Sequence, residues 1–235
     1  MVPIINRLVL GFCRESDEWT GDFVFLSTAR RVEWELDPSP TAVAAFVKVD
    51  GELAEVDSTF TDSALDLSET THPNGGVISS RLIGWDQWFG CFSLNHQDDV
   101  FALYTSWWDG KGKDIRLKCG TGDEKSGWGY KHIRAGKESD WQAKLNAARA
   151  AGWDSTAQGV ESWDDLMSGA TASAVMWPEY RRVSPVNNTT CGVTEIVFAK
   201  KNNPSQVVYS FRVRAAWAND SDRLITSFPQ SGTTC

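Results

Sequence analysis

Positive charge is scarce in this sequence, and so are metal-binding motifs and long apolar runs. Its 235 residues include 23 lysines and arginines against 31 aspartates and glutamates, so the formal net charge is −8. This balance argues against tight binding of duplex nucleic acid, which depends on neutralising phosphates. The longest apolar stretches fall short of the roughly 20 residues that span a bilayer, so we expect no membrane span. The N-terminal segment lacks a basic leader and a small-residue cleavage site, which predicts no signal peptide.

Cysteine and histidine are too few and too scattered for a metal site. The five cysteines and three histidines form no CxxC pair and no HExxH helix, so we expect neither a metal nor another cofactor. The GxSxG, Walker A and GxGxxG signatures of serine hydrolases and nucleotide-binding proteins are missing too. The odd number of cysteines fits either reduced buried thiols or one or two disulfides with one cysteine left over, and Cys191 with Cys235 is a conceivable pair. The five are Cys13, Cys91, Cys119, Cys191 and Cys235.

What the sequence does contain is enough hydrophobic material for a packed core. Hydrophobic residues make up 41% of the chain and 12 residues are tryptophan, which excludes a disordered protein. Charge is uneven, because residues 1–120 carry 10 basic and 19 acidic side chains, whereas residues 121–235 carry 13 and 12. We therefore predict two domains: an acidic β-rich domain of unknown role in residues 1–120, and a second domain in residues 121–235. Only the second has a charge that lets it approach a polyanion.

The apolar periodicity predicts an α+β fold. Segments rich in Val, Phe, Trp and Tyr favour strands in the first half, and the second half changes from helical spacing to strand spacing. We expect helices at 139–151 and 160–167 that cover one face of an antiparallel sheet and leave the other face available. The stretch Thr59–Thr71 fits either a short helix or a loop. The expected strands are 22–26, 31–36, 43–49, 100–107, 114–119, 174–183, 192–200, 206–217 and 223–228.

Alternation along the segment QVVYSFRVRAAW divides its side chains between two faces of a strand. Phe211 and its alternate neighbours point one way, toward the helices, whereas Arg212 and Arg214 point the other way. If Ile225 of the last strand joins the core, Thr226 lies on the same face as the two arginines. The ordinary explanation, that the arginines are the solvated side of a strand, is as well supported by the pattern as a binding role.

The segment GWGYKHIRAGK, from Gly127 to Lys137, gathers one histidine and three cations at the entrance of an expected helix. His132 has the type of side chain best suited to take up or donate a proton near neutral pH. Lys131, Arg134 and Lys137 are close enough in sequence to help hold a phosphate. A lone histidine beside aromatic residues is more often a hydrogen-bonded structural residue, so the local pattern by itself favours a structural role.

The order of GWGYKHI, two helices, CGVTEIVF, VVYSFRVRAAW and RLITSFP resembles the C-terminal toxin domains of bacterial polymorphic and contact-dependent toxins. These domains belong to the ribonuclease group that includes barnase, EndoU, colicin and RelE-type folds, and the resemblance covers residues 126–229, about half of the chain. In them a G-[FW]-G-x-[RK]-H-I segment carries the catalytic histidine and [IV]-T-x-[YF]-P carries a hydroxyl residue, which implies roles for His132 and Thr226. The sequence departs from many relatives where Gly136 and Lys137 replace a second histidine and Phe228 replaces a tyrosine.

The resemblance implies a toxin ribonuclease, delivered into the cytoplasm of a target cell, that cleaves RNA by metal-independent transesterification, with tRNA as one candidate substrate. It also implies an immunity protein as partner, which we expect to be acidic so that it complements the cationic site. Such cleavage needs a base, an acid and donors for the anionic phosphate. We predict catalytic roles for His132, Arg212, Arg214 and Thr226, and substrate binding by Lys131, Arg134, Lys137 and Ser227.

The alternative is a non-enzymatic, β-rich module that binds carbohydrate or protein. Trp85, Trp88, Trp107 and Trp108 could form aromatic platforms for such ligands, although packing inside a β-rich core explains tryptophans equally well. The acidity of residues 1–120 would also suit a mimic of nucleic acid.

Overall fold

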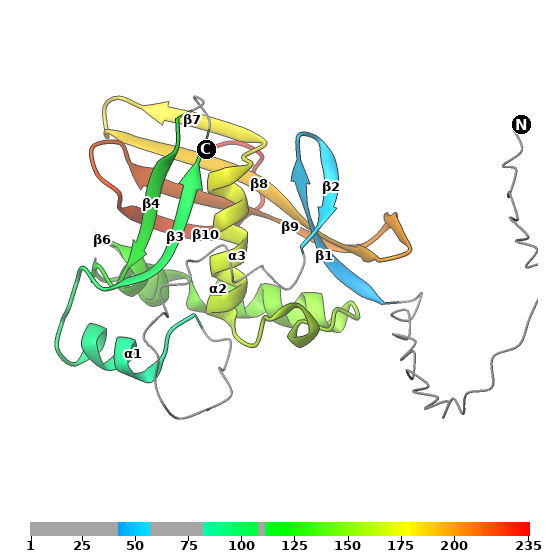
Figure 1. Cartoon of the computed structure of the whole chain (residues 1–235), viewed down its shortest axis with the longest axis horizontal. Helices are drawn as coiled ribbons and strands as arrows, with labels where there is room; N and C mark the ends of the chain where they lie inside the picture. The colour runs from blue at the N-terminus through cyan, green and yellow to red at the C-terminus, as the bar shows by residue number, and fades with distance from the viewer. Residues whose placement is uncertain (1–41, 57–81, 108–110) are drawn as a thin grey trace, which may run out of the picture. The chain divides into compact units, whose positions relative to one another are not determined.

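The computed structural model describes residues 42–56, 82–107 and 111–235, which all belong to one compact unit, Asp37–Cys235. These residues have the predicted α+β fold (Figure 1). The helices are α1 (Trp85–Phe92), α2 (Gly129–Ala150) and α3 (Trp163–Met176), with a 3₁₀ turn, η2, at Thr156–Gln158. The strands are β1 (Val43–Val49), β2 (Glu52–Glu55), β3 (Val100–Ser106), β4 (Lys113–Lys118), β5 (Thr121–Gly122), β6 (Gly127–Trp128), β7 (Tyr180–Ser184), β8 (Thr189–Lys200), β9 (Asn203–Ala218) and β10 (Leu224–Gln230).

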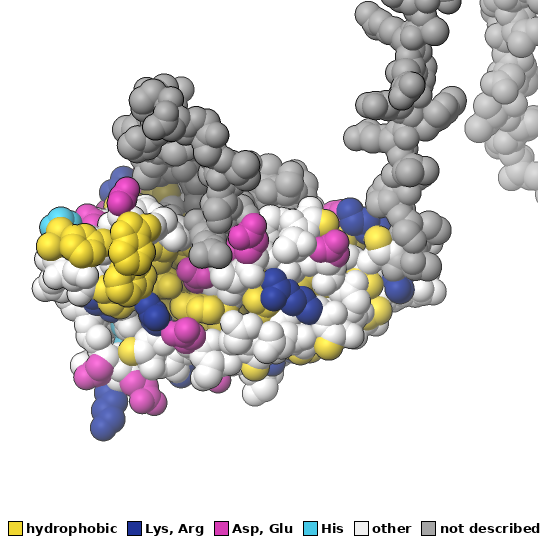
Figure 2. All heavy atoms as spheres, turned by 90° about the horizontal axis from the view of Figure 1, so that it is seen from below, with side chains coloured by type: hydrophobic (Ala, Val, Ile, Leu, Met, Phe, Trp, Pro, Cys, Tyr) yellow, Lys and Arg dark blue, Asp and Glu magenta, His cyan; other side chains and the backbone are white. Residues whose placement is uncertain are grey.

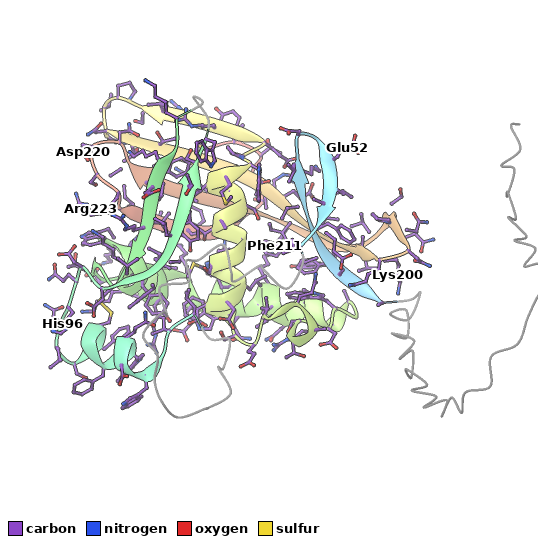
Figure 3. The ribbon with its side chains drawn as sticks, in the orientation of Figure 1. Glu52, His96, Lys200, Phe211, Asp220 and Arg223 are labelled. Carbon is purple, nitrogen blue, oxygen red and sulfur yellow. A yellow bond between two sulfur atoms is a disulfide. The ribbon has the colours of Figure 1, made fainter. Side chains whose placement is uncertain are left out.

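A six-stranded antiparallel sheet forms the centre of the unit. Its strand order is β10-β9-β8-β1-β2, and β7 pairs with the same edge of β8 as β1 does. The 12 residues of β8 make room for both partners, because its first half pairs with β7 and its second half with β1. Asp220 and Arg223 lie at one end of this sheet and Lys200 at the other, with Phe211 between them (Figure 3). Two small ribbons, β3–β4 and β5–β6, complete the strands.

Helices α2 and α3 and the β3–β4 ribbon pack on one face of the sheet. Helix α3 lies beside β3, and α2 packs chiefly on β10 (Figure 1). Trp141 of α2 and Leu166 of α3 are fully buried against the sheet residues Phe198 and Trp217. The approach of α3 to β8 is close, because a Cβ atom at Gly192 would lie 2.1 Å from the carbonyl oxygen of Ala174. We call the opposite side of the sheet the helix-free face.

Helix α3 is longer than predicted, and its last turn takes the place of the start of the expected strand 174–183. Its first turn is held by Asp165, whose carboxylate accepts hydrogen bonds from the backbone N–H groups of Ser162, Glu161 and Leu82. It ends at Met176 because Pro178 follows closely and cannot continue a helix. Residues 165–175 are all buried, so no solvent-facing stripe marks the helical period in the sequence.

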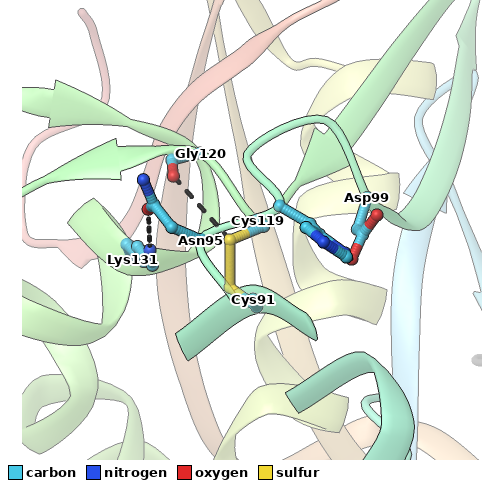
Figure 4. The surroundings of a disulfide bond; sticks show 7 residues. Cys91, Asn95, Asp99, Cys119, Gly120 and Lys131 are labelled. Carbon is cyan, nitrogen blue, oxygen red and sulfur yellow. Dashed lines mark hydrogen bonds and ion pairs between the residues drawn. A yellow bond between two sulfur atoms is a disulfide. The ribbon is translucent and has the colours of Figure 1, made fainter. Parts of the chain in front are cut away.

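Two disulfides tie the ends of these elements together. Cys91–Cys119 joins α1 to the residue that follows β4 (Figure 4), and Cys191–Cys235 joins the C-terminal segment to β8. The second is the pair that the sequence allowed, whereas nothing in the sequence singled out the first. Cys13 lies outside the described residues.

The predicted domain boundary near residue 120 falls inside a single packed unit. Strand β1 pairs with β8 in the same sheet, and one hydrophobic core contains residues from both sides of this position. The hydroxyl groups of Tyr104 and Ser168, for example, lie 3.1 Å apart in that core. The charge of the sequence changes near residue 120, but the hydrophobic core continues across this position.

Several other predicted elements agree with the structure, and some need correction. The strands expected at 43–49, 100–107, 114–119, 192–200, 206–217 and 223–228 correspond to β1, β3, β4, β8, β9 and β10. Helix α2 begins at Gly129, not at residue 139, and α1 was not predicted. The strands expected at 22–26 and 31–36, and the stretch Thr59–Thr71, lie outside the described residues.

Candidate functional site

The strand register places three rows of side chains across the helix-free face. Residues directly opposite each other in an antiparallel pair point to the same side of the sheet. Thr226 therefore shares a face with Arg212 and Arg214. The prediction made this depend on Ile225 entering the core, but Leu224 is the buried residue, and a register shift between Leu224 and Thr226 brings Thr226 to the other face. From β7 or β8 toward β10 the rows are Tyr180–Val193–Arg214–Phe228, Arg182–Cys191–Ala216–Thr226 and Glu195–Arg212–Gln230.

The ring of Phe228 joins cations from the sheet and from α2. The Arg214 guanidinium carbon lies 5.7 Å from the centre of this ring, and Lys137 Nζ lies 5.3 Å from it. Both cations are within the range of cation–π attraction. Because β10 is the edge strand next to α2, Phe228 brings Lys137 to the border of the helix-free face.

A pocket of about 200 Å³ opens beside Arg214 on the same face. We call it the arginine pocket. Its lining residues are Arg182, Ser184, Asn187, Thr189, Cys191, Arg214, Ala216 and Cys235. Small side chains at Cys191 and Ala216 leave the hollow, and longer polar side chains surround it.

Arg212, by contrast, belongs to an ion network. Its Nη2 atom lies 3.8 Å from a carboxylate oxygen of Glu195, which also accepts hydrogen bonds from Lys48 and Ser210. Burial alone would raise the pKa of Glu195, but these hydrogen bonds and the charges of Lys48 and Arg212 outweigh it and lower the pKa. Arg212 is therefore already neutralised by a carboxylate, although it shares the face with Arg214.

His132 lies in the first turn of α2 and faces the β5–β6 turn. Its Nδ1 atom is 2.7 Å from the backbone carbonyl oxygen of Asp123. A carbonyl can only accept, so Nδ1 donates, and Nε2 of the neutral ring is the nitrogen able to take up a proton. The glycines of the GWG motif have a structural reason, because Gly127 and Gly129 adopt φ values of 132° and 77°. Cβ atoms there would lie 2.1 Å and 2.6 Å from backbone oxygens.

The predicted catalytic residues are therefore not all brought together. Helix α2 packs on the covered face of the sheet, whereas Arg212, Arg214 and Thr226 belong to the helix-free face. His132 and Lys137 are five residues apart, which corresponds to a rise of about 7.5 Å and a rotation of about 140° around the helix. Of the two, Lys137 is the one that contacts the ring of Phe228, which Arg214 also contacts.

The remaining predicted substrate-binding residues have contacts of their own. Lys131 donates to the side-chain oxygen of Asn95 at 2.7 Å (Figure 4), and Arg134 donates to Glu138. Both cations also lie over the ring of Phe92. Ser227 was expected to bind substrate but is fully buried on the covered face, where its hydroxyl group accepts a hydrogen bond from Thr171.

Helix α1 carries an exposed aromatic surface, which we define as Trp85, Trp88, Phe89 and Leu94. The exposed fractions of Trp85, Phe89 and Leu94 are 72%, 45% and 54%. The rings of Trp85 and Trp88 stack with their centres 5.4 Å apart. Figure 2 shows large hydrophobic side chains gathered at one end of the molecule. Trp107 is exposed as well, at 60%, and Trp108 lies outside the described residues.

Sequence reasoning missed Arg182. Its only signal was the doubled arginine in YRRVS, and the expected strand 174–183 contained it but did not show which strand would lie beside it. Pairing of β7 with β8 puts Arg182 opposite Cys191 and so on the rim of the arginine pocket.

Comparisons of the chain with protein-family models, with curated proteins and with solved structures give no match. Within residues 42–56, 82–107 and 111–235, no cluster of three or more His, Cys, Asp or Glu side chains could hold a metal ion. In the same part of the chain, no helix combines the length and apolarity needed to cross a membrane. The candidate site is therefore defined by its geometry: Lys137, Arg214, Phe228, Thr226 and the adjoining arginine pocket.

Proposed function

We propose that the unit is a ribonuclease toxin and that RNA binds along the β10 edge of the helix-free face. The observation that supports this most directly is the meeting of Lys137 and Arg214 at the ring of Phe228. Thr226 lies two residues from Phe228 on the same side of β10, which corresponds to about 7 Å. Two cations and a hydroxyl group next to an aromatic ring suit a nucleotide, whose phosphate is anionic and whose base can stack.

The residues have distinct roles in the proposed cleavage. Nε2 of His132 takes the proton of the ribose 2′-hydroxyl group, whose oxygen then attacks phosphorus. The bond to the 5′ oxygen breaks, a 2′,3′-cyclic phosphate remains, and Lys137 gives a proton to the leaving oxygen. Arg214 and Thr226 donate hydrogen bonds to the phosphate oxygens, whose negative charge grows in the transition state.

The separation of His132 and Lys137 restricts this mechanism. Because the two side chains leave α2 in different directions, one phosphate cannot contact both in the observed arrangement. The proposed cleavage therefore requires the segment around the β5–β6 turn and the start of α2 to move when RNA binds. Gly136 of α2 lies close to that turn, since a Cβ atom at this position would be 3.3 Å from the carbonyl oxygen of Glu124.

The test is cleavage of total RNA by the purified chain in EDTA, with product ends analysed for 2′,3′-cyclic phosphate. We expect R214Q and H132A to lower the rate by at least about 100-fold, as loss of a catalytic group does. R212Q is the matched control, because this arginine shares the face but is paired with Glu195. Intact RNA with the unaltered chain, or equal losses in R212Q and R214Q, would refute the proposal.

A second candidate function is binding of carbohydrate or protein through the aromatic surface of α1. The exposure of Trp85 and Phe89 favours it, because soluble proteins rarely expose adjoining large aromatic side chains without a ligand. Tryptophan fluorescence during titration with glycans tests it. A change in the unaltered chain that W85A removes would support this function, whereas no change with any glycan would exclude carbohydrate.

A further inference from the structure

We propose that the arginine pocket binds a tetrahedral oxyanion, a phosphate group. The inference deepens the proposed function, because the pocket would be a second phosphate position on the same RNA, next to Phe228. That the phosphate belongs to RNA rests on the proposed function. Binding of the phosphate group itself depends only on the pocket.

The shape of the pocket comes from the side chains of one row. Cys191 and Ala216 occupy the middle of the row Arg182–Cys191–Ala216–Thr226, and both are too short to fill the space above the strands. The resulting volume of about 200 Å³ exceeds the roughly 30 Å³ that one water molecule takes up in the liquid, so an oxyanion with attached water can enter. The Cys191–Cys235 disulfide contributes one side of the pocket and holds the C-terminal segment beside it.

Within the described residues, no ion pair balances the charge of the two arginines that line the pocket. Arg182 and Arg214 both line it, and among the described residues neither forms an ion pair with a carboxylate. The Nε atom of Arg214 is buried and has no hydrogen-bond partner in this part of the chain. A buried donor without a partner is costly. An anion in the pocket would lie beside both arginines and balance their charge.

The neutral groups on the rim also suit phosphate. Ser184 and Thr189 are opposite each other in the β7–β8 register, and Asn187 lies in the turn that connects these strands. Their hydroxyl and amide groups can donate to phosphate oxygens that the two arginines leave free. The two arginines, together with the hydroxyl groups of Ser184 and Thr189, form a site that favours a multiply charged oxyanion over chloride, because a guanidinium group can bind two oxygens at once.

The experiment is calorimetric titration of the full chain with inorganic phosphate, at constant ionic strength adjusted with sodium chloride. We expect saturable binding to the unaltered chain and at least tenfold weaker binding to R182Q and R214Q. R212Q is the matched control and should bind like the unaltered chain. Arg182 is exposed on an edge strand, so R182Q should fold, and circular dichroism of each variant checks this. Absence of saturable binding, or unchanged binding in R182Q, would overturn the proposal.

The source of the phosphate is tested by a second arm. A short RNA should compete with inorganic phosphate, and the nucleosides that make it up, which carry no phosphate, should compete at least tenfold less well. If the RNA fails to compete while phosphate binds, the site is one for free phosphate, and its identification as a second RNA phosphate position is wrong. Failure of the proposed ribonuclease function would appear separately, as intact RNA in the cleavage assay with phosphate binding unchanged.

Discussion

Removal of the Cys191–Cys235 disulfide should destabilise the folded unit strongly, because this bond closes a long loop. The two cysteines are 44 residues apart in sequence. In the chain-entropy treatment, cross-linking across such a loop lowers the entropy of the unfolded chain enough to stabilise the fold by about 4 kcal/mol. The double variant C191S/C235S should therefore lose about this amount.

The other disulfide allows the loop contribution to be separated from local packing. Cys91 and Cys119 are 28 residues apart, which gives about 3.6 kcal/mol by the same treatment, only slightly less than the longer loop. Both of these cysteines are fully buried, whereas Cys235 is half-buried. Serine at positions 91 and 119 therefore also places hydroxyl groups in an apolar core, and C91S/C119S should be the less stable of the two double variants.

Urea denaturation at neutral pH, followed by tryptophan fluorescence, measures both effects. The free energy of unfolding of the unaltered chain should fall by about 4 kcal/mol in C191S/C235S. A dithiol reductant should destabilise the unaltered chain but have no further effect on a variant that lacks all four paired cysteines. A loss below about 1 kcal/mol in C191S/C235S would refute the loop argument, because it would mean that the C-terminal segment is not effectively constrained.

Three further predictions concern the sheet and its helices. Replacement of the buried Trp141 by phenylalanine should cost about 1–3 kcal/mol in thermal unfolding, because its indole N–H donates to the carbonyl oxygen of Ser227, which would lose its partner. Gly192→Ala should cost about 1–3 kcal/mol, since its Cβ would meet the Ala174 carbonyl oxygen, whereas Gly232→Ala, whose Cβ would make only ordinary van der Waals contacts, should change stability by less than about 0.5 kcal/mol. The pKa of Glu195 is lower in the folded state, so its contribution is complete above the unfolded-state pKa and is lost as pH falls toward the folded-state pKa. As pH falls, the free energy of unfolding should therefore decrease less for E195Q than for the unaltered chain, and equal decreases would contradict this.

The strands were predictable from the sequence because the alternation of apolar and polar residues that identifies a strand is local. Alternation in β9 correctly assigned Phe211 to the core and Arg212 and Arg214 to the other face, since a strand repeats every two residues whatever it packs against. Helix α3 was not predictable in the same way. It is buried on all sides by the sheet and the β3–β4 ribbon, and burial on all sides removes the polar stripe from which helical period is recognised.

The candidate site was predictable only in part, because it depends on which strands are neighbours. Arg214 and Thr226 were identified from β9 and β10, which follow each other in the chain. Arg182 was missed because β7 pairs with only half of β8, and nothing in its own sequence specifies that partner. His132 and Lys137 are close in sequence, but the start of α2 at Gly129 places both inside the helix and turns them to different sides.

The structure also changes what the net charge implies for phosphate binding. Residues 121–235 have nearly balanced charge, which by itself suggests weak attraction for a polyanion. The balance is not uniform, because many cations of the described unit are paired: Arg116 and Lys118 with Asp222, Arg134 with Glu138, and Lys48 and Arg212 with Glu195. In the same described ranges, Lys137, Arg182 and Arg214 form no ion pair with a carboxylate. Electrostatic attraction falls off over about 10 Å at moderate salt, so a phosphate at the β10 edge responds chiefly to Lys137 and Arg214, and a phosphate in the arginine pocket responds to Arg182 and Arg214, more than to the total charge of the chain.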